Sequence, residues 1–288
     1  MNTAPAPNST PTALPARRTV ALVAIGAVLI VALLVVGELL LSRPPSAPQL
    51  TFIGTGDALS ILAEGAGGGR VLIGGGPNGA DLPAALGRHF VPWRRDLDLL
   101  IVADRRDLPG ATELVRRGQV RAVLLVGLEE ERAAAAALVI LRDACVARGV
   151  PVRVSAESER VTIGRVGRGG ALTLDIVPAL INDEGAQLRV QARTLSAAIV
   201  TGTAIPAPVQ AVILPRAAAE SYHAAFAVMP RLVVAPALPA ASVSVASAVD
   251  SQLLLVSPGL RATLSMTERG LSLHGATLTV LDTASMTR

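Results

Sequence analysis

The sequence predicts a mixed α/β domain built in layers, preceded by one long apolar helix. Three observations indicate this class. Residues 19–41 are apolar except for Thr19 and Glu38. From residue 50 to residue 154, short strand-like runs alternate with segments of helical period, and beyond residue 160 the strand-like runs dominate. Alternation followed by a β-rich meander is typical of layered α/β domains, and no linker sequence divides the region.

Residues 19–41 predict a retained membrane anchor. At about 1.5 Å per residue this run spans the roughly 30 Å hydrocarbon core of a bilayer. A cleaved signal peptide is the alternative, but it would end at a small-residue cleavage site, and the following SRPPSAPQ offers none. Arg17 and Arg18 precede the run and only Arg43 follows it closely, so the positive-inside rule places the domain outside the cell membrane. The predicted single-pass organisation is a disordered cytoplasmic tail (1–18), a transmembrane helix (19–41), a Pro-rich spacer (42–49) and one domain (50–282).

The elements of the domain follow from the spacing of its apolar residues and from its glycines and prolines. Runs of Val, Leu and Ile bounded by Gly or Pro predict strands, whereas apolar residues that recur every three or four positions predict helices. In the first half we expect strands at 50–53, 58–63, 70–73, 97–102, 122–126 and 152–154, and helices at 80–90, 110–117 and 129–148. In the second half we expect one helix at 217–228, and strands at 160–163, 171–177, 188–192, 197–200, 211–214, 232–235, 253–256, 262–266, around Leu273 and around Leu278.

Composition excludes several classes of function. The chain has no lysine, so a Walker-type phosphate loop is impossible. A net charge of +4 with almost no aromatic residues does not indicate nucleic-acid binding. The single cysteine, Cys145, excludes an internal disulfide, and its Ala-rich helical surroundings predict a buried thiol. The three histidines stand apart from one another and from metal-ligand spacings, so we interpret them as packing or surface residues: His89, His223 and His274.

Two features of the chain leave ligand binding open. Residues 74–79 match G-x-G-x-x-G between a strand and a helix, as a dinucleotide loop would. Against that interpretation, Pro77 removes one backbone donor, and a turn at 65–69 places a hairpin where a βαβ unit is needed. Arginine pairs at 94–95, 105–106 and 116–117 could line an anion-binding face, although separate solvated charges are the simpler interpretation.

Residues 52–126 resemble the start of the metallo-β-lactamase-like domain of ComEC-type competence proteins, which take up DNA. That family opens with a strand, a G-x-G-D-A run, a glycine turn, L-I-D-G-G-P and an aspartate-led strand. The resemblance implies a four-layer αββα sandwich with a cleft at the rim near Gly56 and the glycine loop. The matching segments here are Gly54-Thr-Gly56-Asp57-Ala58-Leu59-Ser60-Ile61, Leu72-Ile73-Gly74-Gly75-Gly76-Pro77 and Asp98-Leu99-Leu100-Ile101-Val102.

The chain departs from this family where the family binds metal. The aspartate of L-I-D-G-G is Gly74 here, and the family's His- and Asp-rich metal-binding run corresponds to residues 103–110, which contain no histidine. A later histidine segment corresponds to residues 211–216, again without histidine. We therefore carry over no catalytic residue, no metal ligand and no cofactor, and we expect Arg105 and Arg106 to lie where the ligands are lost. The expected vestigial cleft consists of Asp57, Gly74, Gly75, Gly76, Asp104, Arg105, Arg106 and Asp107.

Two classes of function follow from these residues. The first is a membrane-anchored, non-catalytic domain that binds or scaffolds an unknown protein or an anionic ligand. The second is a metal-dependent hydrolase or phosphodiesterase with a rearranged site around Asp57, Asp104 and Asp107. Nucleic acid as a partner, and a link to DNA uptake, follow from the family analogy alone.

Overall fold

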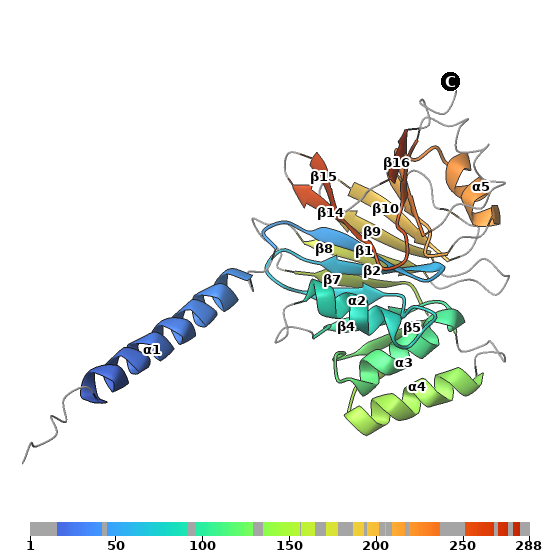
Figure 1. Cartoon of the computed structure of the whole chain (residues 1–288). Helices are drawn as coiled ribbons and strands as arrows, with labels where there is room; N and C mark the ends of the chain where they lie inside the picture. Colours follow the sequence, from blue (N-terminus) through green and yellow to red (C-terminus); the bar gives the residue numbers. More distant parts are fainter. Residues whose placement is uncertain are drawn as a thin grey trace, which may run out of the picture. The chain divides into compact units, whose positions relative to one another are not determined.

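The computed structural model consists of two units, residues 1–43 and 44–288, and describes most of the second. The mixed α/β class predicted from the sequence is confirmed by two large mixed sheets and a small number of helices (Figure 1). The described residues are 16–41, 45–90, 96–128, 135–155, 157–164, 171–177, 187–192, 195–201, 205, 209–216, 219–236, 251–267, 270–275 and 279–282.

The first unit contains the helix α1 (Ala16–Leu41), which covers the apolar run 19–41. Its described apolar side chains between Ile25 and Val36 are largely exposed. In the part of the chain whose side chains the structure describes, no helix is both long enough and apolar enough to cross a membrane. Residues 1–15 of the predicted tail and residues 42–44 of the spacer lie outside the described residues, whereas residues 16–18 of the tail belong to α1. The membrane anchor stays a prediction.

The first sheet has the strand order β15-β14-β1-β2-β3-β4-β5-β6. Strands β1 to β3 form antiparallel hairpins, and β3 to β6 are parallel, with helices in their connections. The strands are β1 (Gln49–Thr55), β2 (Ala58–Glu64), β3 (Arg70–Ile73), β4 (Leu99–Val102), β5 (Val123–Val126), β6 (Val152–Ser155), β14 (Arg261–Thr267) and β15 (Gly270–Gly275). The helices are α2 (Asp81–His89), the 3-10 turn η1 (Arg105–Asp107), α3 (Leu108–Arg116) and α4 (Ala135–Arg148).

The second sheet has the order β16-β13-β12-β11-β10-β9-β8-β7 and repeats the same plan. Antiparallel strands β7 to β10 are followed by parallel strands β11 to β13, and α5 (Ala219–Ala227) connects β11 to β12. The strands are β7 (Glu159–Ile163), β8 (Leu172–Val177), β9 (Gln187–Ala192), β10 (Leu195–Val200), β11 (Ala211–Ile213), β12 (Leu232–Ala235), β13 (Gln252–Leu255) and β16 (Thr279–Asp282).

Three apolar clusters define the layers. Alternate residues of a strand point to opposite faces, so Ile61 of β2 packs between the sheets while its neighbour Leu62 packs under α2 to α4. On β11, Ile213 likewise joins the cluster between the sheets, and Val212 joins Tyr222 and Phe226 of α5. The two sheets therefore pack face to face, with α2, α3 and α4 on one outer face and α5 on the other (Figure 1).

The described elements coincide with the predicted ones to within a few residues. Helix α3 begins at Leu108, two residues before the predicted start at residue 110. Pro109 can lie in its first turn, because the N–H that proline lacks would have no partner there. The predicted helix at 129–148 is described from Ala135 onward, and residues 129–134 lie outside the described residues. Cys145 is buried in α4, as expected.

One expectation about the glycine loop was wrong. The hairpin β2–β3 does precede it, but β3, α2 and β4 form a parallel βαβ unit, because β3 pairs antiparallel with β2 on one side and parallel with β4 on the other. The topology therefore does not exclude a nucleotide loop at residues 74–79. Whether residues 74–79 could bind a nucleotide therefore depends on the contacts of the loop's backbone N–H groups.

Candidate functional site

The candidate site lies where loops of both sheets meet at one edge. The β1–β2 turn, the loop after β3 and the loop after β4 come from the first sheet, and the residues after β11 come from the second. The backbone joins the sheets here: Leu59 donates its N–H to the carbonyl of Pro215 (2.7 Å), and Ala58 forms an isolated β-bridge with Arg216. Segments more than a hundred residues apart are thus held together.

The carboxylate of Asp107 lies against the glycine loop at residues 74–76. Asp107 is the N-cap residue of α3, yet its side chain does not cap that helix; its carboxylate accepts hydrogen bonds from the backbone N–H groups of Gly75 and Gly76. Gly74 and Gly76 have positive φ angles of 84° and 73°, which suit glycine. Successive N–H groups in such a loop form an anion-binding nest. The protein's own carboxylate thus takes up the two N–H groups of Gly75 and Gly76, which a nucleotide phosphate in this loop would otherwise use.

Arg216 lies at the centre of the acidic residues. Its Nε donates to Asp104 Oδ2 (2.7 Å), and its Nη2 donates to Asp107 Oδ1 (2.9 Å). Its Nη1 is 3.7 Å from Asp57 Oδ1, an ion-pair distance too long for a hydrogen bond, and that nitrogen is buried. The Arg216 side chain is 13% exposed, so most of the guanidinium is shielded from solvent.

The structure brings together six of the eight residues expected in the cleft: Asp57, Gly74, Gly75, Gly76, Asp104 and Asp107. The expectation for Arg105 and Arg106 needs correction, because both side chains are exposed. Asp104 caps η1 by accepting from the Arg106 N–H (2.8 Å), and in this short turn Asp107 is buried while the two arginines face solvent. The cation among the carboxylates is Arg216, which sequence reasoning placed in the segment replacing the family's histidines but did not treat as a site residue.

The residues of this cleft do not fit a metal ion. Across the described part of the chain, no group of three or more His, Cys, Asp or Glu side chains is arranged to hold one. Asp104 and Asp107 direct one oxygen each at the Arg216 guanidinium, and their remaining acceptors are occupied at least in part by backbone N–H groups. A catalytic metal needs about three protein ligands and an open position, and a guanidinium at the centre opposes a second cation electrostatically.

No protein-family model matches the chain, and no curated protein sequence matches it significantly.

The charges around Asp107 predict an unusual titration. Burial raises the pKa of Asp107 to about 6; Arg216 and the amides of Gly76 and Gly75 act to lower this pKa, and Asp104 acts to raise it. An unfolded aspartate has a pKa of about 3.9. Because the folded pKa is the higher one, the folded state binds the proton more tightly between these values. The contribution of Asp107 to the free energy of unfolding therefore decreases as pH rises from about 4 to about 6, and is constant above that.

We expect a carboxyl ¹³C resonance of Asp107 to titrate with a midpoint near 6 in chain labelled at aspartate. The Asp107→Asn variant should lack this resonance, and its free energy of unfolding should lose the decrease over the same pH range. A midpoint below about 4 would show that the guanidinium and the two amides outweigh burial at this carboxyl.

A second buried carboxylate has a structural role. Glu64 accepts hydrogen bonds from Gln49 Nε2 (2.7 Å) and Arg70 Nε (3.1 Å), and its Oε2 is 3.5 Å from His89 Nε2. Burial acts to raise the pKa of Glu64, but the contacts with His89, Gln49 and Arg70 lower it overall. On the other side of the ring, Arg261 Nη1 lies 3.1 Å from His89 Nδ1. His89 is thus a packing residue that ties the end of α2 to the sheet.

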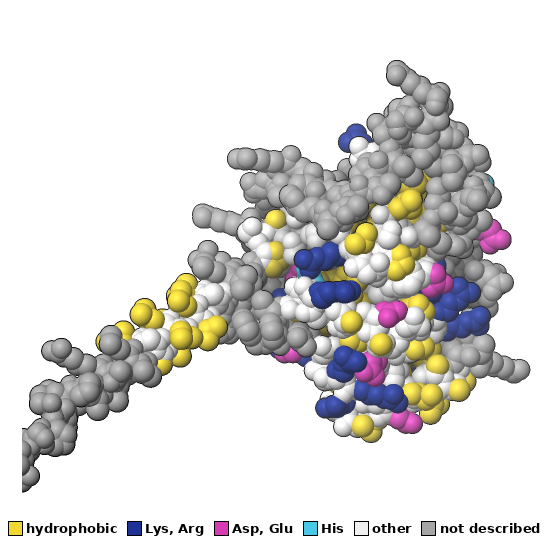
Figure 2. Space-filling model, in the orientation of Figure 1, with side chains coloured by type: hydrophobic (Ala, Val, Ile, Leu, Met, Phe, Trp, Pro, Cys, Tyr) yellow, Lys and Arg dark blue, Asp and Glu magenta, His cyan; other side chains and the backbone are white. Residues whose placement is uncertain are grey.

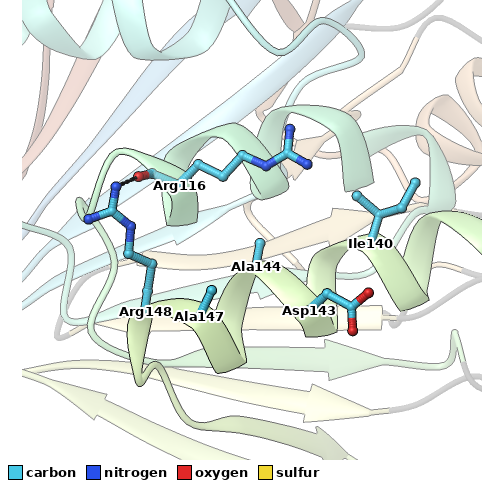
Figure 3. Close-up of a pocket in the computed structure, with 6 residues that line it drawn as sticks. All are labelled: Arg116, Ile140, Asp143, Ala144, Ala147 and Arg148. Carbon is cyan, nitrogen blue, oxygen red and sulfur yellow. Dashed lines mark hydrogen bonds between the residues drawn. The ribbon is translucent and has the colours of Figure 1, made fainter.

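The described surface also has an open groove of about 400 Å³ between α3 and α4 (Figure 3). Arg148 donates to the backbone carbonyl of Arg116 at one end, and the floor is formed by small side chains of α4. Val139 and Val146 of α4 are more than half exposed near it. Figure 2 shows arginine, acidic and apolar side chains intermingled on the visible face of the domain. The groove is lined by Arg116, Ile140, Asp143, Ala144, Ala147 and Arg148.

Proposed function

We propose that this chain is a membrane-anchored, non-catalytic binding or scaffolding module with a metallo-β-lactamase-like, ComEC-type αββα fold. The observation that carries the proposal is the position of Arg216 among Asp57, Asp104 and Asp107. A guanidinium that remains charged at all accessible pH values supplies neither a metal-bound water nor a general base.

The layer order and the place of the site support the family assignment. Helices α2 to α4, the first sheet, the second sheet and α5 follow one another in the order that the resemblance implies. The glycine loop and the residues after β4 lie at the carboxyl ends of neighbouring parallel strands, where α/β sheets bind ligands. The segment after β11 reaches the same edge, as the resemblance requires of its late histidine segment.

The second candidate, a hydrolase with a rearranged site, has weaker support. It needs Asp57, Asp104 and Asp107 to hold a metal ion that activates water. In the structure all three carboxylates face the guanidinium of Arg216, and Asp57 is 73% exposed on the β1–β2 turn. A metal would have to displace Arg216 from buried charge-assisted hydrogen bonds, which are among the stronger ones in proteins.

Membrane attachment is proposed from the N-terminal helix. The 26 residues of α1 correspond to about 39 Å at 1.5 Å per residue, longer than the roughly 30 Å hydrocarbon core. An exposed helix with this density of Val, Leu and Ile would be costly in water. With the positive-inside rule, these features support a single-pass anchor with the domain outside the cell membrane.

The groove between α3 and α4 offers a surface on which the module could bind its partner. Arg116 and Arg148 supply positive charge beside the single carboxylate of Asp143, and Ile140, Ala144 and Ala147 supply aliphatic surface. These groups suit a protein segment that presents aliphatic side chains beside an acidic one. Among the described residues, Figure 2 shows arginines interspersed with acidic and apolar side chains, and DNA as a partner rests on the family analogy.

The proposal is tested on the full-length chain in two steps. The chain should remain in the pellet when membranes are washed with alkaline carbonate, and a variant lacking residues 1–41 should be soluble. After detergent extraction, the full-length chain should contain no stoichiometric zinc or manganese. It should hydrolyse neither a chromogenic phosphodiester nor a chromogenic cephalosporin faster than the Asp104→Ala variant does.

Asp57→Ala is the second test variant for this assay, because Asp57 belongs to the rearranged metal site yet is exposed, so its loss should not disturb folding. Stoichiometric metal together with hydrolysis that Asp57→Ala and Asp104→Ala both abolish would establish the hydrolase instead. Full release of the wild type by carbonate would show that α1 does not anchor the chain.

A further inference from the structure

The three segments in which the resemblance implies metal ligands lie side by side in this chain, and two of them are joined by one side chain, that of Arg216. Gly74 stands at the first, residues 103–110 form the second, and residues 211–216 form the third. Gly74 lies against Asp107, with 3.3 Å between the position of a Cβ at Gly74 and Asp107 Oδ2. Asp104 and Asp107 of the second segment both bind Arg216 of the third. The place at which these segments meet is therefore occupied by a guanidinium.

The shape of the guanidinium suits this position. It is planar, and each of its three nitrogens faces a different carboxylate: Nε faces Asp104, Nη2 faces Asp107 and Nη1 faces Asp57. A lysine ammonium is a single point charge and could not direct separate donors to three groups in one plane. The contacts are graded, since two are hydrogen bonds and the third, to the exposed Asp57, is an ion pair at 3.7 Å.

The guanidinium also connects the two sheets. Arg216 follows β11 of the second sheet, whereas Asp104 and Asp107 follow β4 of the first sheet. Near it, Leu59 of β2 and Pro215 share a backbone hydrogen bond. A bound divalent cation could crosslink loops in the same way, but it would dissociate and could be removed by a chelator. An arginine side chain is covalently attached and does not lose its charge in proteins.

We infer that Arg216 is the built-in cation of the cleft: its guanidinium stands in for the metal ion of a metallo-β-lactamase-like site, neutralises Asp104 and Asp107, and fastens the two sheets together. This inference rests on the proposed fold and deepens the proposed function, because it explains how the cleft persists without metal chemistry. In this inference the chain differs from the family in its cation, which is a guanidinium where the family has a metal ion.

The test is thermal unfolding of the full-length chain in detergent. The midpoint Tm of the wild type should shift neither with EDTA nor with added Mn²⁺. Arg216→Met should lower Tm by about 10 °C, because it leaves two shielded carboxylates without a partner. This loss should be smaller at pH 5 than at pH 8, since the pKa of Asp107 is raised to about 6 and its carboxylate takes up a proton at the lower pH. Arg106→Met, which removes an exposed arginine of the same loop, should change Tm by no more than about 2 °C.

The decisive variant removes the charge of Arg216 together with the charges of Asp104 and Asp107. In Arg216→Met/Asp104→Asn/Asp107→Asn the only carboxylate left from the three ion pairs is that of Asp57, which is 73% exposed and therefore solvated. We expect Tm to recover at least half of the loss, as buried ion pairs replaced by neutral groups commonly do. A triple variant no more stable than Arg216→Met would overturn the inference and leave Arg216 with a packing role only. A wild-type Tm that falls in EDTA would overturn it as well.

If Arg216→Met does not fold, the Arg216→Lys variant tests the inference instead. The lysine variant should fold with a lower Tm, and the pKa of Asp107 should rise further; an unchanged Asp107 titration would overturn the inference. The non-catalytic function and the role of Arg216 as the cation can be contradicted independently of each other. Hydrolysis by the wild type combined with rescue in the triple variant would overturn the non-catalytic function but retain Arg216 as the cation. Absence of both hydrolysis and rescue would do the opposite.

Discussion

Replacing Gly110 with alanine is expected to lower the free energy of unfolding by about 3 kcal/mol, although alanine is the better helix former. Gly110 lies in the first turn of α3, where a Cβ would overlap the backbone carbonyl oxygen of Gly75 and lie 2.8 Å from that of Gly76. Backbone atoms cannot rotate away as the end of a side chain can. The helix and the glycine loop would have to separate, which would also draw the amides of Gly75 and Gly76 away from Asp107.

Gly87→Ala is the matched control for this prediction. Gly87 is also helical, in α2, but nothing lies within 4 Å of the position of its Cβ. Alanine should therefore raise the free energy of unfolding by about 0.5–1 kcal/mol, as expected for an unobstructed helical site. Denaturant unfolding followed by circular dichroism measures both changes. Equal effects of the two substitutions would mean that α3 does not pack against the glycine loop as described.

Replacing Phe52 with alanine is expected to cost about 3–5 kcal/mol of unfolding free energy. Phe52 lies in β1, is fully buried, and belongs to the cluster between the two sheets. Its neighbours across the first sheet are Ile61 of β2 and Ala262 of β14. The chain has only three phenylalanines, so the smaller aliphatic residues around this ring cannot replace the volume that it fills.

Two further variants separate cavity formation from strand propensity. Phe52→Leu keeps most of the apolar volume and should cost less than about 1.5 kcal/mol. Val177→Ala removes methyl groups from β8 of the second sheet, where the side chain is 42% exposed, and should stay within about 1 kcal/mol. A loss at Phe52 no larger than that at Val177 would contradict the packing of the two sheets against each other.

The sequence predicted the elements well because each depends on neighbouring residues. The glycine-bounded apolar run of β2 and the three-to-four spacing in α4 are local patterns, and both lie within the described elements. The glycine loop could also be predicted from the sequence, because positive φ angles favour glycine and two residues of the loop adopt them. Asp57, Asp104 and Asp107 were grouped with that loop on the order of segments in the resemblance, and in the structure all three carboxylates lie around Arg216. Whether the cleft lacks a metal and whether α1 crosses a membrane stay predictions.

The tertiary structure alone decided what lies at the centre of the site. Sequence reasoning placed Arg105 and Arg106 there, because they adjoin Asp104 and Asp107 in the chain. The 3-10 turn instead leaves both exposed, and the cation comes from Arg216, which is 112 residues from Asp104 and 109 from Asp107 in sequence. Local periodicity carries no information about which distant strand ends meet. That meeting depends on how two sheets bury their shared apolar faces, and this packing places Arg216 among the carboxylates of the other sheet.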